Sequence, residues 1–336
     1  MTHDFIGELT FVAESGDHPH LLQIVKRLRR PVRVAVCGRA GVGRGCVAAA
    51  LRRRGVHVIP RGAGADAFDV CVLVIAETVK PEDLAVPRSV RRPVVIALTK
   101  ADLAGAGPGG PIAVARHRAT AVRGMTGMSV VPVVGLLAAL DGGDLEPDLV
   151  AALSRFVTEP PNLTSVDAFV DDPHPVGRDV RARLLTRLDR FGIAHAVLAL
   201  ADGCDAAGLG DRLSQLGNLD ELMVALDGAS ATVGYRRMHE AMAELHSLAA
   251  QSNDERLSEL LASDATVLAT MGAAVAVIEA AGLSVDRGDT AAAHLDRAVR
   301  WRRYGRGPVD ALHRRCSADV VRGSLRLFDA AQRSPT

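Results

Sequence analysis

Four closely spaced glycines form the strongest chemical signal in the sequence. Gly38, Gly41, Gly43 and Gly45 follow the apolar run 32–36 and precede an alanine-rich segment. Glycine adopts positive φ angles easily, so such a turn can direct several backbone N–H groups to one side. The N-terminus of a following helix adds partial positive charge. The pattern predicts a cradle for an anion such as a phosphate group.

The spacing of Gly38 and Gly43 fits the phosphate-loop (P-loop) pattern G-x-x-x-x-G-K-[ST]. The two residues after Gly43 depart from it. Arg44 replaces the lysine that contacts the β- and γ-phosphates, and Gly45 replaces the hydroxyl residue that binds Mg²⁺. Arginine keeps the charge but is planar and bulkier, so we expect phosphate contact at Arg44 and no Mg²⁺ binding.

Two other interpretations of the glycines stay open. The dinucleotide fingerprint G-x-G-x-x-G fits Gly41 and Gly43 only if Cys46 takes the place of the third glycine, and here Gly38 already follows the strand directly. Alternatively, the glycines form a structural turn that binds nothing.

A second signal is Thr99-Lys100-Ala101-Asp102, which closes the apolar run 93–100. Together with the glycine turn it resembles the P-loop GTPase family, whose [NT]-K-x-D motif recognises guanine. The resemblance implies that Asp102 accepts hydrogen bonds from the guanine N1–H and amino groups, and that the Lys100 side chain packs on the ring. It also implies a backbone donor at Gly135, although Val134 departs from the family's Ser-Ala step.

Lysine usage supports this resemblance, because the chain has only three lysines and one of them is Lys100. The alternative is that Lys100 and Asp102 form a solvated turn in which the aspartate caps the next helix.

The family resemblance breaks down between Gly38 and Asp69. A full GTPase needs a first switch loop, two strands and a D-x-x-G second switch there, and this interval is too short for them. Residues 60–64 offer no aspartate for Mg²⁺ and no group that positions water. The resemblance therefore implies a degenerate GTPase (pseudo-GTPase) that holds GDP or GTP weakly, or not at all, and hydrolyses little.

The elements that would position these residues can be read from hydrophobic periodicity. Apolar runs at 32–36, 56–59, 69–77, 93–100 and 129–138 alternate with helix-sized intervals, which predicts parallel strands. We expect a shortened, doubly wound α/β domain over residues 31–144, with its ligand at the C-terminal strand ends. A helical lead-in over 1–30 precedes it.

A helical domain is expected over 145–336, with one Pro-rich connector at 159–175. Part of it, residues 177–250, resembles the helical arms of bacterial dynamin-like proteins.

Composition excludes several classes of protein. A net charge of +1 gives no reason to expect nucleic acid as a partner. The five cysteines form no C-x-x-C pair, and the histidines lack ligand spacing, so we predict neither a disulfide framework nor a metal site. The N-terminus lacks signal-peptide features, which indicates the cytoplasm.

Two C-terminal segments leave room for a membrane surface. The uncharged run 265–278 is shorter than a membrane span and is expected as a buried helix, with membrane insertion as the alternative. Residues 299–306 place Trp301 among arginines, which suits an anionic lipid surface, a nucleic acid or a protein partner. The alternative is that Trp301 packs in a helical core while its arginines are solvated.

The leading hypothesis is a regulatory or scaffolding pseudo-GTPase that is cytoplasmic and peripherally associated with membranes. It would pair through its nucleotide face with another GTPase-like protein or with itself, and Arg39, Arg44 or Arg61 would reach the neighbour's phosphates. The alternatives are an active dynamin-like GTPase that remodels membranes and a purely structural interaction protein.

Overall fold

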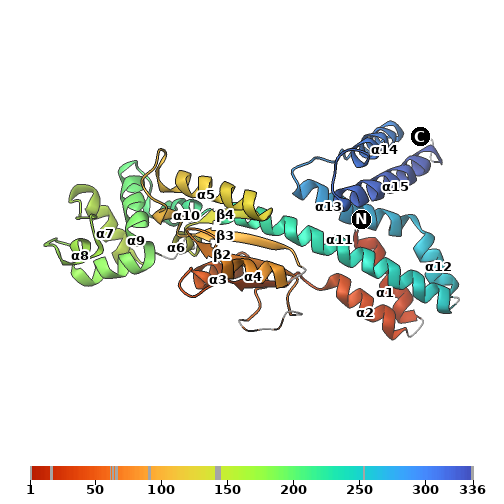
Figure 1. The fold of residues 1–336 in the computed structure, drawn as a ribbon, viewed down its shortest axis with the longest axis horizontal. Coiled ribbons are helices and arrows are strands. Elements are labelled where there is room, and N and C mark those ends of the chain that lie inside the picture. Colours follow the sequence, from red (N-terminus) through yellow and green to blue (C-terminus); the bar gives the residue numbers. More distant parts are fainter. Residues whose placement is uncertain are drawn as a thin grey trace. The chain divides into compact units, whose positions relative to one another are not determined.

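The computed structural model describes residues 2–15, 18–60, 62, 64, 67–89, 92–140, 145–252 and 254–333 (Figure 1). The chain forms two compact units. Unit 2 comprises residues 33–226, and unit 1 combines residues 1–32 with 227–336. The boundary between the units falls within one long helix, α11 (Leu219–Ser252).

Unit 2 is built on a four-stranded parallel sheet in the order β1-β2-β3-β4. The strands are β1 (Val34–Cys37), β2 (Val70–Ala76), β3 (Val94–Thr99) and β4 (Ser129–Val133). β-branched and apolar residues on both faces of the strands favour a sheet that is buried on both sides. The register pairs Ala76 with Thr99 and Thr99 with Val133, so the carboxyl ends of β2, β3 and β4 form one edge.

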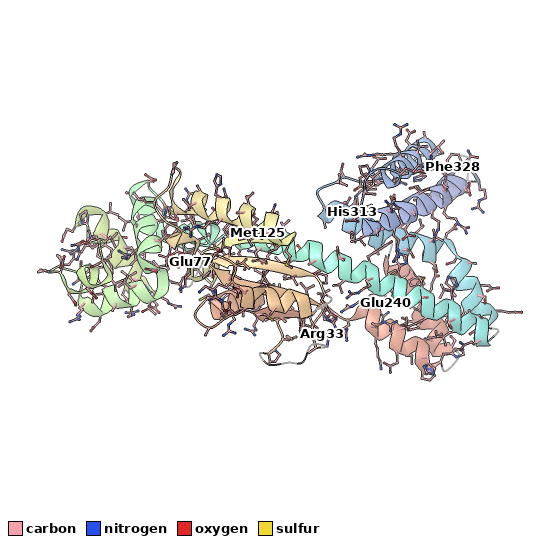
Figure 2. The ribbon with its side chains drawn as sticks, viewed as in Figure 1. Arg33, Glu77, Met125, Glu240, His313 and Phe328 are labelled. Atoms are coloured by element: carbon pink, nitrogen blue, oxygen red, sulfur yellow. The ribbon has the colours of Figure 1, made fainter. Side chains whose placement is uncertain are left out.

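Helices cover both faces of the sheet, which confirms the expected α/β class. The nearest helices are α3 (Arg44–Arg53), α4 (Pro81–Ser89) and α5 (Gly110–Thr126). Leu73 and Ile96 of the sheet pack with Ala119 and Val122 of α5, and α3 lies on the other side of the strands (Figure 1). Figure 2 shows Arg33 and Glu77 at opposite ends of the sheet.

Two strand predictions need correction. The run 56–59 forms only an isolated parallel bridge between Val58 and Val34, because a short segment interrupted by His57 offers little apolar surface to pair. The run 129–138 is a strand only as far as Val133, since Gly135–Ala138 form the short helix α6.

The remaining helices of unit 2 share a second core with the end of the sheet. They are α7 (Pro147–Thr158), α8 (Val166–Asp171), α9 (Arg178–Ala201) and α10 (Ala206–Leu216). Leu184 and Leu188 of α9 pack with Ala101 and Ala104, which follow β3. Helices α7–α10 therefore belong to the same compact unit as the sheet.

Unit 1 is helical in the part that the structure describes. Besides the C-terminal part of α11 it contains α1 (Thr2–Ser15), α2 (Pro19–Arg29), α12 (Glu255–Ala262), α13 (Asp264–Ala280), α14 (Ala291–Gly305) and α15 (Ala311–Arg333). Phe5 and Leu9 of α1 pack with Met238 and Leu245 of α11. Within the segment 1–30, α1 and α2 are helical as expected, but they pack with the C-terminal helices.

The two C-terminal segments, 265–278 and 299–306, both contribute apolar side chains to this helical core. Residues 265–278 fall in α13, and Trp301 is only 2% exposed, packed with Met271 and Cys316. No single helix of the described chain is long and apolar enough to span a membrane. Only α12 and α13 together satisfy that length and composition, and they bend by 50° at their junction.

A buried carboxylate joins α11 to α15. Asp319 is 3% exposed, and its Oδ2 accepts hydrogen bonds from the Tyr235 hydroxyl (2.6 Å) and from Nε2 of His239 (2.8 Å). A charged acceptor inside a helical core needs such donors, because it has lost its contacts with water.

We predict that Tyr235→Phe lowers the free energy of unfolding by about 1.5–3 kcal/mol, because Asp319 loses a charge-assisted hydrogen bond. Tyr304→Phe is the matched control, since no hydrogen bond of the Tyr304 hydroxyl is seen among the described residues, and it should change stability by less than about 0.5 kcal/mol. Urea unfolding of both variants measures the difference, and equal losses would contradict the prediction.

Candidate functional site

The glycine-rich turn joins β1 to α3 at the carboxyl edge of the sheet. Gly38 has a φ of 137°, and a Cβ atom there would lie 2.2 Å from the Val74 carbonyl oxygen of β2. No side chain fits that space. Gly41 and Gly43 also have positive φ angles, 77° and 87°, and Gly43 directly precedes α3. The turn therefore takes the tight course for which the sequence supplies glycines.

Thr99, at the end of β3, fixes this turn in place. Its side chain is 2% exposed, and its hydroxyl contacts the Val42 carbonyl of the turn and the Ile75 carbonyl of β2 (2.9 Å). A hydroxyl has one proton, so the two carbonyls share it. The sequence predicts Thr99 among the nucleotide-binding residues. In the structure its buried hydroxyl holds the turn against β2 and β3.

The open side of the turn presents backbone donors. The first helical hydrogen bond of α3 runs from the Val47 N–H to the Gly43 carbonyl (3.2 Å). The N–H groups of Arg44, Gly45 and Cys46 lie in the first turn, where a helix supplies no acceptor. Gly45 is exposed, with nothing within 4 Å of the position its Cβ would take. This end of α3 has the geometry and the partial charge that favour an anion.

The arginines beside the turn have partners within the chain. Arg44 donates from Nη1 to the Gly38 carbonyl at 2.5 Å. Arg39 donates from Nε to Asp83 at 3.0 Å, and that carboxylate, 1% exposed, also accepts from the Lys80 N–H. Arg61 lies outside the described residues. These bonds hold the side chains of Arg39 and Arg44 against the chain, and each bond uses one of the five guanidinium N–H groups.

Asp83 is a residue that the sequence analysis missed. Its pairing with Arg39 ties the turn to the start of α4. An acidic residue after Pro81 is typical of the first turn of a helix, but that signal says nothing of a partner 44 residues away in the sequence.

Lys100 and Asp102 lie at the same edge, two strands from β1. Two strand spacings correspond to roughly 10 Å. Lys100 is exposed and has a left-handed backbone, with φ 56° and ψ 37°. Asp102 follows in a short 3₁₀ helix, Ala101–Leu103, and is half-buried. Burial raises the pKa of Asp102 above its usual value, and the nearby Asp189 raises it further, while its own backbone N–H and Lys100 lower it.

Asp189 lies at a break inside α9, which the sequence does not predict. Its φ of 54° and ψ of 175° are a conformation that residues other than glycine rarely adopt. The next residue, Arg190, donates hydrogen bonds from Nη1 to the carbonyls of Leu163 (3.1 Å) and Thr164 (2.7 Å). A strained backbone thus places a second carboxylate near Asp102.

Gly135 approaches the turn from the end of β4. It is the first residue of α6, and a Cβ on it would lie 3.3 Å from the Cβ of Cys46 in the first turn of α3. The preceding Val134 N–H donates to the Gly217 carbonyl at 3.2 Å. The structure therefore brings Gly135 against the start of α3, beside the predicted anion cradle.

The part of this edge around Lys100 contains little empty space. Glu77, Lys100 and Arg118 help to line a hollow of only about 10 Å³. Glu77, like Lys100, has a positive φ, of 64°. Within the described ranges, no group of three His, Cys, Asp or Glu side chains could hold a metal ion. A base bound here would lie on the surface of the edge or would displace side chains.

Cys37, the last residue of β1, has an unusual thiol. A hydrogen bond from the Cys71 thiol lowers the pKa of Cys37 to about 7, against the opposing effect of burial, and the positive charge of Arg44 lowers it further. The same pairing and burial raise the pKa of Cys71. The thiolate of Cys37 is therefore well populated at neutral pH.

Comparison with known proteins identifies no relative. No family model matches the chain, and neither a curated protein nor a solved structure matches it significantly.

We predict that Gly38→Ala lowers the free energy of unfolding by roughly 2–4 kcal/mol, because the new Cβ collides with the Val74 carbonyl at a positive φ. Gly45→Ala is the control: its Cβ meets open space at a helical position, so it should be neutral or stabilise by up to about 1 kcal/mol. Chemical denaturation separates them, and similar values would show that the turn is not packed as described.

We also predict that Cys37 reacts with iodoacetamide at a rate that is half-maximal near pH 7, because the thiolate is the nucleophile. Cys204 is the internal control, half-buried in a different part of unit 2. Peptide mass spectrometry after timed labelling measures both. A Cys37 rate that still rose steeply above pH 8 would contradict the lowered pKa.

Proposed function

We propose that this chain is a pseudo-GTPase, a regulatory or scaffolding subunit that binds GDP or GTP weakly and hydrolyses little. One observation carries the proposal. The glycine turn, Lys100, Asp102 and Gly135, which come from three separate strand ends, lie along one edge of a parallel sheet. Parallel α/β sheets bind their ligands at that edge.

The chemistry at the edge supports a guanine nucleotide in particular. The first turn of α3 offers N–H groups to phosphates, and Asp102 offers a carboxylate that can accept two hydrogen bonds from guanine N1–H and its amino group. Adenine lacks that pair of donors. Lys100 has an aliphatic stem that can lie on a base and a charge that the exposed edge keeps solvated.

The same edge lacks what phosphoryl transfer requires. Gly45 has no hydroxyl that could bind Mg²⁺. The Arg44 guanidinium donates a hydrogen bond to the Gly38 carbonyl within the turn. Without a metal and a positioned water, the electrostatic terms that dominate this reaction are missing. We therefore infer binding without efficient turnover.

A regulatory role follows from binding without turnover. Such a chain can pair with a catalytically intact GTPase-like protein, or with a second copy of itself, across the nucleotide face. The intramolecular bonds of Arg39 and Arg44 argue against their acting as free cations toward the partner. The pairing surface would then depend on the shape of the edge and on bound nucleotide.

We predict that Asp102→Asn weakens GDP binding by roughly 1–3 kcal/mol, because an amide presents its own donors to the guanine donors. It should leave thermal stability unchanged or raise it. The pKa of Asp102 is higher in the folded than in the unfolded chain, so ionisation of Asp102 opposes folding. The free energy of unfolding therefore falls as the pH rises from the unfolded-state pKa through the folded-state pKa. The neutral amide in Asp102→Asn avoids this loss.

Asp211→Asn is the matched control, since Asp211 is exposed on α10 of the same unit. Displacement of a fluorescent GDP analogue and thermal unfolding are measured on all three proteins. If GDP binds to Asp102→Asn and to the control as tightly as to the native chain, Asp102 is not the residue that recognises the base.

A further inference from the structure

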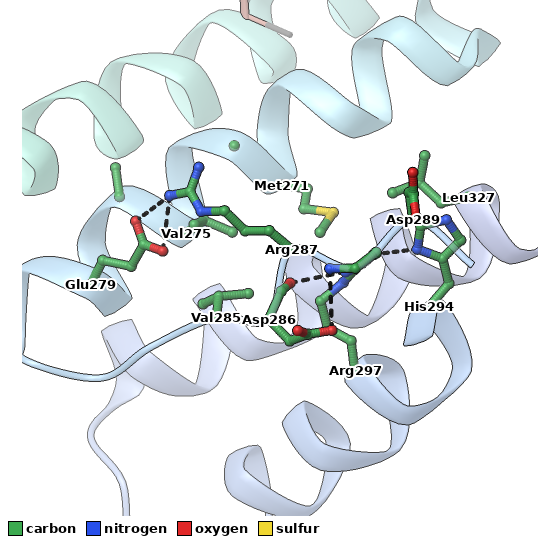
Figure 3. A pocket seen from close by; sticks show the side chains of 13 residues that line it. Met271, Val275, Glu279, Val285, Asp286, Arg287, Asp289, His294, Arg297 and Leu327 are labelled. Atoms are coloured by element: carbon green, nitrogen blue, oxygen red, sulfur yellow. Dashed lines mark hydrogen bonds and ion pairs between the residues drawn. The ribbon is translucent and has the colours of Figure 1, made fainter. Parts of the chain in front are cut away.

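Unit 1 contains a cavity of about 560 Å³ that is separate from the sheet edge (Figure 3). It lies among α13, the segment 281–290, α14 and the end of α15. Its volume is within the range of small-molecule sites. Its apolar lining comes mainly from Met271, Val275, Ala276, Val285 and Leu327.

The inner wall carries a buried positive charge. Arg297 is 4% exposed and donates to the Ser324 hydroxyl (3.0 Å), to the carbonyls of Asp286 (2.9 Å) and Gly288 (3.1 Å), and to Nδ1 of His294 (2.6 Å). These bonds engage four of its five N–H groups. They fix the guanidinium and the 286–288 backbone in one arrangement, so the cavity is preformed.

Every acceptor of Arg297 is neutral. Among the described residues no carboxylate oxygen lies within 4 Å of its guanidinium, although Asp286 is near enough to act on it electrostatically. Burial lowers the pKa of Arg297 and also that of His294, which keeps the imidazole neutral. Buried charges in proteins are normally paired. An anionic group at this wall would supply the missing partner and take the remaining Nη2–H.

The rim of the cavity has the opposite character. Glu279 is neutralised by Arg287, which donates from Nη2 to both of its carboxylate oxygens at 3.0 and 2.8 Å. Among the described residues, the Asp286 carboxylate accepts a hydrogen bond only from the Gly288 N–H, at 3.3 Å. Asp289 is exposed, and its carboxylate has no hydrogen bond or ion pair among the described residues. A cationic group at the rim would meet these two acids.

We propose that this cavity binds a small aliphatic zwitterion, such as an apolar α-amino acid. Its carboxylate pairs with Arg297, its ammonium lies beside Asp289 and Asp286, and its side chain covers the wall of Met271, Val275 and Leu327. Phosphate esters are disfavoured, because their second negative charge would face the rim acids. The proposal concerns unit 1 and does not depend on nucleotide binding.

Three matched ligands test the charge arrangement on the 336-residue chain. L-Leucine carries both charges, 4-methylpentanoate lacks the ammonium, and 3-methylbutylamine lacks the carboxylate. Titration calorimetry should give leucine at least a tenfold tighter affinity than either analogue. No leucine binding at millimolar concentration, or equal affinity for leucine and 4-methylpentanoate, would overturn the proposal.

Two variants locate the site without disturbing Arg297. Asp289→Asn should weaken leucine at least tenfold and leave 4-methylpentanoate unchanged, because only the ammonium contact is lost. Ala276→Trp should abolish binding of all three ligands by filling the cavity. Asp329→Asn, an exposed carboxylate elsewhere on α15, is the control and should bind leucine as the native chain does. Equal weakening of leucine and 4-methylpentanoate by Asp289→Asn, or unchanged binding in Ala276→Trp, would place the ligand elsewhere.

Discussion

The contact between Gly38 and β2 determines the arrangement of the sheet edge. The turn passes so close to the Val74 carbonyl that only a glycine fits, and the Thr99 hydroxyl then holds the next part of the turn through the Val42 carbonyl. These two constraints fix where α3 begins and where its free N–H groups point. They also tie β1, β2 and β3 together at the end where Lys100 and Asp102 lie.

The edge combines features that favour binding with features that oppose catalysis. Backbone N–H groups that favour an anion lie in the first turn of α3, and the Asp102 carboxylate lies just after β3 at the same edge. The raised pKa of Asp102 shows that its ionised form is costly in this setting, and the strained Asp189 nearby adds to that cost. Strain and desolvation of this kind are typical of functional sites and are not needed to hold a core together. The missing hydroxyl at Gly45 removes the simplest route to Mg²⁺.

Much of the sheet could be predicted from the sequence, because each long apolar run with helix-sized flanks behaves as a parallel strand. The glycine turn could also be predicted, because the spacing of its glycines is a local feature of the sequence. Long-range pairing could not. Nothing in the run 56–59 reveals that it makes one bridge, and nothing near residue 30 reveals that α1 and α2 pack with α11 in unit 1. The partners of Arg39 and the break at Asp189 depend on tertiary contacts that periodicity does not encode.

The most direct test of the account is a calorimetric titration of the native chain with GDP and with ADP, each in the presence of Mg²⁺ and in the presence of EDTA. We expect measurable but weak GDP binding, at least tenfold weaker ADP binding, and affinities that hardly change when Mg²⁺ is removed. Tighter binding of ADP, or GDP binding that disappears in EDTA, would contradict the assignment of this edge as a metal-independent guanine site.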